Sequence, residues 1–334
     1  MSLQTDNRVL APSTKIEGCR SCGSSKLHSF LDLGTTPLAD RLLTEEELSQ
    51  PELVSPLDVV FCEDCCLVQI TETVAPEVLF CQNYPYFSSV SKSLMEHFGS
   101  SAEQLLQQRR LNSHSLVMEA ASNDGYMLKH FVEAGVPVLG IDPADGPAKK
   151  ADEQGVRTLN TFFTKELAEE LREEGNLADV FLANNVLAHV ADLNGFTEGI
   201  ASVLKEDGVA VIECPYLLDL IDHCEFDTIY HQHLCYFSVT ALVKLFQRHR
   251  LSLNKVVRTP IHGGSLRLFI EKRIDVNLSV TSLLDAERKA GVDTLAYYES
   301  FAARVQKLKA DLIAELERQK ACLLYTSDAA DELT

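Results

Sequence analysis

Short apolar segments alternate with helical segments between residues 92 and 273, and this alternation restricts the possible folds more than any other feature of the chain. Helical patterns such as that of 126–135 separate apolar runs that have the length of buried strands. The four runs are 115–120, 136–142, 178–185 and 208–215. Because strands separated by helices are typical of βαβ units, we predict an α/β fold with a doubly wound parallel sheet.

The composition is that of a globular protein, with 46% hydrophobic and 24% charged residues, and 334 residues suffice for roughly two domains. Acidic residues outnumber basic ones by 49 to 30, and the net charge of −19 argues against nucleic acid as a partner. No segment has the ~18 uncharged apolar residues of a membrane span, and the N-terminus lacks the apolar core of a signal peptide. We therefore expect a cytoplasmic location without membrane attachment.

Ten cysteines in a chain of this kind favour metal ligands or buried thiols over disulfides. Four of them form a CxxC…CxxC set: Cys19, Cys22, Cys62 and Cys65. Two intervening residues let both thiolates of a pair reach one tetrahedral ion, and Gly23 permits the tight turn. Four protein ligands leave no open position, so we predict a structural zinc site. Cys66 is a second candidate for the place of Cys65, and four unrelated cysteines are the alternative.

A small-residue turn follows the first apolar run, at the place where an open α/β sheet binds its ligands. The next strand ends at Asp142, whose carboxylate suits a ribose diol. The GxGxxG pattern and the phosphate-binding loop are absent, and the remaining combination resembles class I S-adenosylmethionine-dependent methyltransferases. The cofactor-binding candidates are Glu119, Ala121, Ser122, Asn123, Gly125, Asp142 and Asn184. An ordinary turn after the first strand is the alternative.

Residues 226–238 carry two histidines and two tyrosines after the fourth apolar run. Methyl transfer to carbon requires a base that removes a proton, and the pKa of histidine lies near working pH. The resulting enolate needs a hydrogen-bond donor at its oxygen, for which Tyr230 and His189 are candidates. Alternating residues of an extended segment point to one side, so both His231 and His233 are candidates for the base. The alternative is that these side chains only pack, with their polar atoms satisfied.

The chain as a whole resembles the sugar C-methyltransferases that act on nucleotide-linked 4-keto deoxysugars, notably the 3-C-methyltransferases. The resemblance runs in order from residue 19 to about 267. Besides the CxxC pairs it rests on six segments: YPYFSS at 84–89, EAASNDGY at 119–126, NNVLAHV at 184–190, ECPYLLDL at 213–220, EFDTIYHQHLCYFS at 225–238 and GGSLR at 263–267. It implies a class I methyltransferase domain with a Rossmann-like sheet, preceded by a small zinc-binding domain that covers the substrate.

This resemblance implies that S-adenosylmethionine donates the methyl group and that His233 is the base. It places Tyr230 and His189 around the ketone oxygen, and it matches Tyr84 to a tyrosine of the N-terminal region. Family members commonly carry Glu where this chain has Gln232, and an amide cannot accept a proton. The resemblance favours an enzyme that C-methylates a nucleotide-linked keto deoxysugar. A zinc-bearing binding protein with impaired catalysis and an O- or N-methyltransferase are the competing hypotheses.

We predict four parts of the chain: a zinc-binding domain at 1–80, a methyltransferase domain at 81–273, helices that begin a C-terminal domain at 274–320, and a non-native tail at 321–334. Family members continue after the long helix into another α/β lobe, so the chain is expected to be a truncated copy. Arg267 is a candidate for contact with a substrate phosphate, and an ordinary hairpin is the alternative. The expected partner is the nucleotide-sugar, and the sequence leaves the oligomeric state open, a monomer included.

Overall fold

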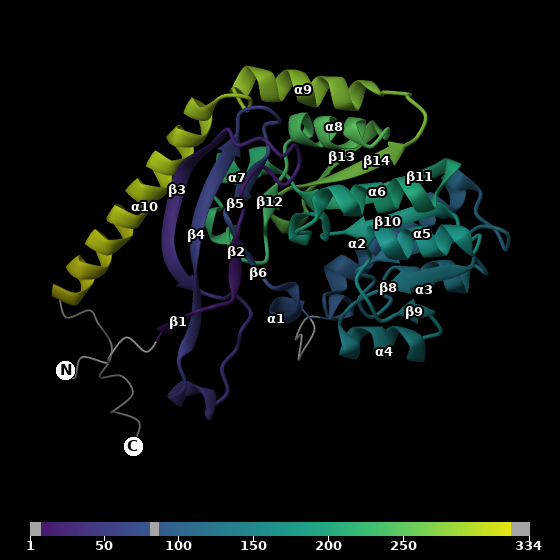
Figure 1. The fold of residues 1–334 in the computed structure, drawn as a ribbon, viewed down its shortest axis with the longest axis horizontal. Coiled ribbons are helices and arrows are strands. Elements are labelled where there is room, and N and C mark those ends of the chain that lie inside the picture. The colour runs from purple at the N-terminus through teal and green to yellow at the C-terminus, as the bar shows by residue number, and fades with distance from the viewer. Residues whose placement is uncertain (1–7, 81–86, 322–334) are drawn as a thin grey trace.

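The computed structural model describes residues 8–80 and 87–321 of the chain (Figure 1). An N-terminal domain of long strands lies beside a larger α/β domain, and the last helix runs along the outer side of the N-terminal strands. Tyr84 and the predicted non-native tail beyond residue 321 lie outside the described residues.

The α/β domain is built on a sheet of seven strands in the order β13-β14-β11-β10-β7-β8-β9. The strands are β7 (Val117–Ala120), β8 (Val138–Ile141), β9 (Thr158–Leu159), β10 (Ala178–Asn184), β11 (Leu204–Pro215), β13 (Ser252–Thr259) and β14 (Ser265–Glu271). The four predicted runs form β7, β8, β10 and β11, which pair in parallel with their neighbours in this group. The sheet is nevertheless mixed, because β14 pairs antiparallel with both β11 and β13. Strand β14 follows β13 in a hairpin and lies between β13 and β11, so it runs opposite to both.

Helices cover both faces of this sheet, as a doubly wound fold requires. They are α2 (Lys92–Arg109), α3 (Leu128–Glu133), α4 (Asp145–Glu153), α5 (Lys165–Glu173), α6 (Leu193–Val203) and α8 (Val239–Arg248). Helix α7 (Leu217–His223) follows β11 beyond the carboxyl end of the strand. Phe98 of α2 and Phe131 of α3 pack with Val180 on one face. Phe196 of α6 and Phe246 of α8 belong to the core on the other face, which continues into the N-terminal domain. Between β10 and α6 the chain forms the 3-10 turn η3 (Leu187–His189), and α6 begins at Leu193.

The N-terminal domain contains a five-stranded sheet in the order β1-β4-β5-β12, with β3 paired to β4, and a two-stranded sheet of β2 and β6. Its elements are β1 (Arg8–Leu10), β2 (Ser13–Lys15), β3 (Leu27–Pro37), β4 (Glu52–Cys62), β5 (Val68–Ile70), β6 (Glu72–Val74) and α1 (Pro76–Phe80). The fifth strand, β12 (Cys235–Tyr236), comes from the α/β part of the chain. The two domains therefore share one sheet.

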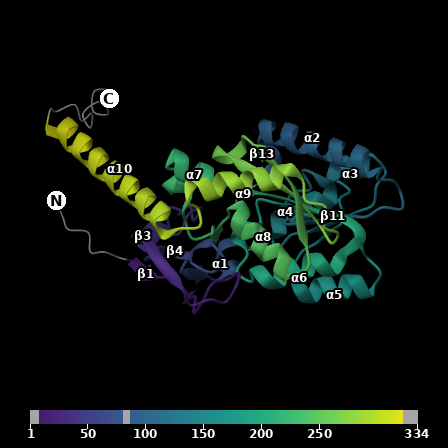
Figure 2. The ribbon, with the colours of Figure 1, turned by 90° about the horizontal axis from the view of Figure 1, so that it is seen from above.

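Two further helices, α9 (Leu278–Ala290) and α10 (Leu295–Ala321), follow the large sheet. The ring of Tyr298 in α10 stacks on Phe61 at 4.7 Å between centroids and lies 5.2 Å from Phe30, so α10 packs on the N-terminal sheet. Figure 2 shows how the C-terminal half of α10 extends away from the body of the molecule. Among the described residues, none of the helices has the length and apolar character needed to traverse a membrane.

Candidate functional site

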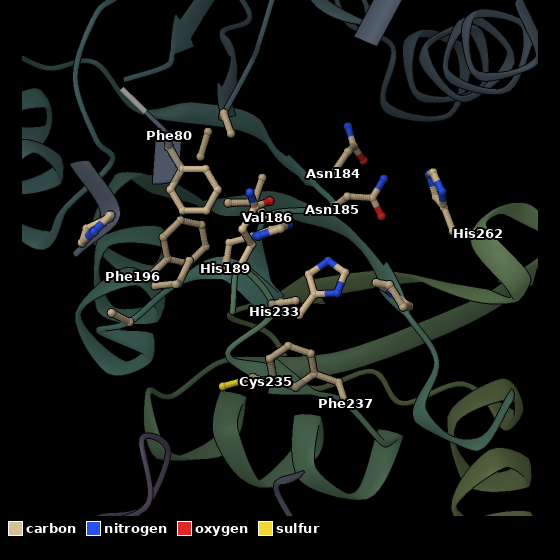
Figure 3. A pocket seen from close by; sticks show the side chains of 18 of the residues that line it. Phe80, Asn184, Asn185, Val186, His189, Phe196, His233, Cys235, Phe237 and His262 are labelled. Carbon is tan, nitrogen blue, oxygen red and sulfur yellow. The ribbon is translucent and has the colours of Figure 1, made fainter. Parts of the chain in front are cut away.

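A cavity of about 840 Å³ opens at the carboxyl ends of β7, β8, β10 and β11. Its lining comes from the turns after these strands, from residues 225–237, and from Asp40 and α1 of the N-terminal domain. Figure 3 shows this cavity, with His189 and His233 next to each other and Asn184 and Asn185 above them. The cavity thus lies where doubly wound sheets bind their ligands.

The turn after β7 is held by the carboxylate of Asp142 at the end of β8. Asp142 accepts hydrogen bonds from the backbone N–H of Asn123 at 2.8 Å and of Ala144 at 2.9 Å. Burial raises the pKa of this carboxyl group, and the two backbone N–H donors oppose that rise. Ala121 and Asn123 have φ angles of 50° and 48°, in the left-handed region that side chains rarely adopt. The carboxylate therefore stabilises a strained turn that borders the cavity.

Four of the seven cofactor-binding candidates line this cavity: Ala121, Asn123, Asp142 and Asn184. Glu119 lies behind them, fully buried, and accepts hydrogen bonds from the Asn184 amide at 2.9 Å and the Tyr126 hydroxyl at 3.1 Å. Burial raises the pKa of Glu119 to about 8. Ser122 and Gly125 are not among the lining residues. A Cβ atom on Gly125 would lie 2.9 Å from Val156, so this glycine allows close packing under the turn.

This lining fits the S-adenosylmethionine that the sequence resemblance implies. Each oxygen of the Asp142 carboxylate retains a lone pair for a hydroxyl donor after it has accepted a backbone N–H. The buried Oδ1 atom of Asn185 has no hydrogen-bond partner within the described part of the chain. Asn185 has a φ of 54° and follows β10 directly. Sequence reasoning missed Asn185, although the pair Asn184-Asn185 at a strand end was a usable signal.

His233 faces the cavity with its tautomer determined by two neighbours. Its Nδ1 atom lies 2.8 Å from the carbonyl oxygen of Thr228, which can only accept a hydrogen bond, so Nδ1 carries the proton. The hydroxyl group of Tyr230 lies 3.1 Å from Nε2, which is left as the acceptor. Burial lowers the pKa of His233, and the Thr228 carbonyl partly opposes this. A neutral imidazole with a free-base Nε2 atom is therefore the form present near neutral pH.

His189 lies against His233, with 4.8 Å between the ring centroids. Its ring is perpendicular to that of Phe80 of α1, at a centroid distance of 5.6 Å. Burial lowers the pKa of His189 to about 3, and His233 contributes to this effect. The buried Nδ1 atom of His189 has no hydrogen-bond partner among the residues that the structure describes. A second neutral imidazole thus stands beside the first with one nitrogen unused.

The two histidines of the Tyr-His-Gln-His segment point to different places. The expectation that His231 and His233 share one side is wrong, because the segment turns back through a hydrogen bond from His233 N–H to the Tyr230 carbonyl at 2.9 Å. Nε2 of His231 lies 3.0 Å from the carbonyl oxygen of Ser55 in β4, so this histidine joins the two domains. Gln232 lines the cavity, and its amide donates to the carbonyl of Ala39 at 3.5 Å.

Three further cavity-lining side chains were not singled out from the sequence: Asp40, Tyr236 and His262. The buried hydroxyl of Tyr236 has no hydrogen-bond partner among the described residues, and its ring lies 6.4 Å from that of His233. Asp40 and His262 carry no sequence signal, since they lie in separate turns far from the catalytic candidates in the chain. Tyr236 lies in the same segment as His233, and only its place in the structure distinguishes it.

Arg267 does not reach the cavity. It is buried beside Glu213 of β11, with 2.5 Å between Arg267 Nε and Glu213 Oε1. Nε2 of His97 in α2 lies 2.8 Å from the other carboxylate oxygen of Glu213. The ion pair neutralises both charges inside the fold, so the structure favours the hairpin alternative over contact with a phosphate.

The four cysteines of the N-terminal set converge on one point, with their sulfur atoms all within 4.8 Å of one another. The Cys19–Cys65 and Cys22–Cys62 sulfur pairs are 3.4 and 3.6 Å apart. Tetrahedral zinc with bonds of about 2.3 Å places its sulfur ligands roughly 3.8 Å apart, so the donor set fits this ion. Cys66 points elsewhere, to the Lys244 ammonium group at 3.3 Å.

Three family models match consecutive parts of the chain. They describe a zinc binding domain at residues 19–80, a methyltransferase domain at 95–254 and a C-methyltransferase C-terminal domain at 260–323. The last match does not support the expected truncation of the C-terminal domain.

Among individual proteins, C-methyltransferase NovU from Streptomyces niveus is 35% identical over 306 residues, which are 91% of this chain and 72% of that protein. A ubiquinone biosynthesis O-methyltransferase from Azorhizobium caulinodans is 29% identical over 36% of this chain and 46% of its own length. Among solved structures, magnesium protoporphyrin IX methyltransferase from Synechocystis PCC 6803 matches with a TM-score of 0.43 and 17% identity, over 54% of this chain and 83% of that one.

Proposed function

Because the chain belongs to the S-adenosylmethionine-dependent C-methyltransferases with a zinc-binding N-terminal domain, we propose that it methylates the carbon next to the ketone of a nucleotide-linked keto deoxysugar. The observation that supports this proposal most is the group of His233, Tyr230 and His189 in one cavity at the strand ends. A base with two neutral hydrogen-bond donors beside it is what the formation of an enolate requires.

In the proposed mechanism, Nε2 of His233 removes the proton from the substrate carbon. The Thr228 carbonyl holds the proton of Nδ1, so the lone pair of Nε2 is directed away from Thr228, toward Tyr230 and the cavity. Bound substrate takes the place of the Tyr230 hydroxyl at this lone pair, and the hydroxyl donates to the ketone oxygen instead. The same carbonyl then stabilises the imidazolium ion that forms.

The electron pair of the broken C–H bond moves to the ketone oxygen, where negative charge develops. The hydroxyl of Tyr230 and the N–H group of neutral His189 donate hydrogen bonds to this oxygen in our proposal. Since the pKa of His189 is about 3, its imidazole donates without carrying a charge that would repel the protonated base. Donors held in place before the reaction are worth several kcal/mol in such sites, roughly 3–4 for one donor.

S-adenosylmethionine, when bound, supplies an electrophilic methyl group for the carbon that has lost its proton. We assign its binding to the turn around Asn123, to the carboxylate of Asp142 and to Asn184, which all line the same cavity. Phe80, Phe237 and Tyr236 supply apolar walls around the histidines and exclude water from the developing charge. A deoxysugar, with fewer hydroxyl groups than an ordinary hexose, suits such walls.

The test uses labelled S-adenosylmethionine and a panel of nucleotide-linked keto sugars, with product NMR to distinguish a new C–C bond from an O-methyl or N-methyl group. Solvent deuterium exchange at the carbon beside the ketone, measured without the methyl donor, reports the base separately. His233→Ala is expected to abolish both activities and to leave the affinity for S-adenosylhomocysteine unchanged.

His231→Ala is the matched control, because this histidine contacts the Ser55 carbonyl and not the cavity. It is expected to retain measurable exchange. Exchange that survives in His233→Ala but is lost in His231→Ala would show that the base has been assigned to the wrong histidine. Label that enters only an oxygen or nitrogen position would refute the C-methylation of this substrate class.

A further inference from the structure

The segment that carries His233 is completed by a strand of the zinc-binding domain. Strand β12 begins two residues after His233 and pairs antiparallel with β5, with Gln69 opposite Cys235. The backbone N–H of Ile70 donates to the carbonyl of Leu234 at 3.0 Å and extends this pairing toward His233. Figure 1 shows β5 and β12 side by side between the two domains. A pair of such short strands is marginal by itself, so its position depends on what holds β5.

Strand β5 is held by the zinc-binding cysteines through Arg20. This residue lies inside the first pair, between Cys19 and Cys22, and its guanidinium group donates to the Ile70 carbonyl at 2.5 Å and to the Thr73 hydroxyl at 2.7 Å. Its backbone N–H donates to Oε1 of Gln69 at 3.1 Å. Arg20 therefore connects the metal-binding turn to β5 by bonds to both backbone and side chains.

The same chain of hydrogen bonds continues to the second histidine. The backbone N–H of Leu234 donates to the carbonyl of Ala188 at 2.7 Å, and Ala188 precedes His189 in the turn η3. This one hydrogen bond joins the residue that follows His233 to the residue that precedes His189. A displacement of β12 along β5 would change the position of both imidazoles relative to Asp142 and the rest of the cofactor site.

We propose that the zinc site has a catalytic consequence: through Arg20 and β5 it positions His233 and His189 over the cofactor-binding half of the cavity. Arg20 is in this sense a positioning residue, and the inference rests on the function proposed above. A displacement of about 1 Å between reacting groups can lower a rate by about 100-fold, so a small change of register is sufficient. Cofactor binding, which depends on β7, β8 and β10, is expected to be insensitive to such a change.

The experiment compares Arg20→Lys with Lys26→Met. Lysine keeps the charge but cannot reach all the acceptors of the guanidinium group. Lys26 lies near the same cysteines, and its ammonium group forms an exposed ion pair with Asp64 at 3.1 Å that does not involve β5. The readouts are the zinc content, the affinity for S-adenosylhomocysteine, the exchange rate at the substrate carbon, and the NMR signals of the histidine C2–H protons.

Arg20→Lys is expected to keep its zinc and its affinity for S-adenosylhomocysteine, to lose exchange by about 10-fold or more, and to shift the C2–H signals of His189 and His233. Lys26→Met is expected to match the wild type in all four readouts. An Arg20→Lys protein with full zinc, wild-type exchange and unshifted histidine signals would overturn the proposal.

Gln69→Met provides the second variant if Arg20→Lys loses its zinc. It removes the acceptor of the Arg20 backbone N–H from β5 without changing the cysteine pair. We expect the same shifted signals and reduced exchange at full zinc content, and unshifted signals would overturn the proposal. The histidine signals are measured without substrate, so they distinguish a failure of the positioning from a failure of the proposed reaction.

Discussion

The neutral state of His189 has a measurable cost in stability at low pH. Its pKa in the folded protein is about 3, because burial disfavours the charged imidazolium, whereas the unfolded chain has a pKa near 6.5. The unfolded state therefore binds more protons in the range between about pH 6.5 and about pH 3. The stability that His189 contributes is complete above this pH, and it is lost progressively as the pH falls toward about 3.

The size of this loss follows from the difference between the two pKa values. A pH of about 5 lies about 1.5 units below the pKa of the unfolded histidine, so protonation stabilises the unfolded chain by about 2 kcal/mol. Folded His189 stays neutral at this pH and gains nothing. His189→Asn removes the titrating group and keeps a side chain with an N–H donor. The wild type is therefore expected to lose about 2 kcal/mol more than His189→Asn when the pH is lowered from about 7.5 to about 5.

Urea unfolding at both pH values, followed by circular dichroism, measures this difference, and the chain has no tryptophan whose fluorescence could be used instead. The comparison of the two proteins cancels the contributions of the buried histidines that do not contact His189. Equal pH dependence of wild type and His189→Asn would refute the reasoning, because His189 would then accept its proton equally well in both states.

Three further predictions concern the metal, the cofactor and the base. Metal analysis is expected to find about one zinc ion per chain, and Cys62→Ser to lose it; a metal-free wild type that is still folded would contradict the site. Asp142→Ala is expected to weaken the binding of S-adenosylhomocysteine, measured by calorimetry, by roughly 1.5–3 kcal/mol, and unchanged affinity would remove Asp142 from the cofactor site. The same substitution is expected to lower the free energy of unfolding, since the backbone N–H groups of Asn123 and Ala144 lose their acceptor. Gln232→Glu is expected to raise the pKa of His233, because both side chains line the cavity and a carboxylate there favours the charged imidazolium, and so to move the rise of the exchange rate to higher pH; an unmoved profile would show that residue 232 does not act on the base.

The fold of the α/β domain was largely predictable, since apolar runs and helical periodicity identify buried strands locally. The four predicted runs became β7, β8, β10 and β11, but the antiparallel β14 was not foreseen. Its direction is decided by the hairpin with β13 and by pairing across the sheet, which are not encoded in the periodicity of one segment. The same holds for β12, whose two residues are too few to show any pattern.

The site was predictable where motifs keep functional residues close in sequence. Tyr230 and His233 lie three residues apart, and the structure brings them together with His189. The residues that were missed, such as Asn185 and Tyr236, depend on backbone conformation and on which side chains remain unsatisfied after packing. The different directions of His231 and His233 depend on a single turn, which alternation along an extended strand could not reveal.

The shared sheet makes the N-terminal domain a poor unit of exchange between related enzymes. A chimera joined between residues 80 and 87 would place β5 of one parent against β12 of another, although these strands face each other residue by residue. The carbonyls of Ser55 and Pro56 would likewise have to accept a histidine from a foreign chain. A working chimera therefore has to take residues 229–237 and residues 8–80 from the same parent. The part of the chain that can be exchanged as one piece is thus discontinuous in sequence.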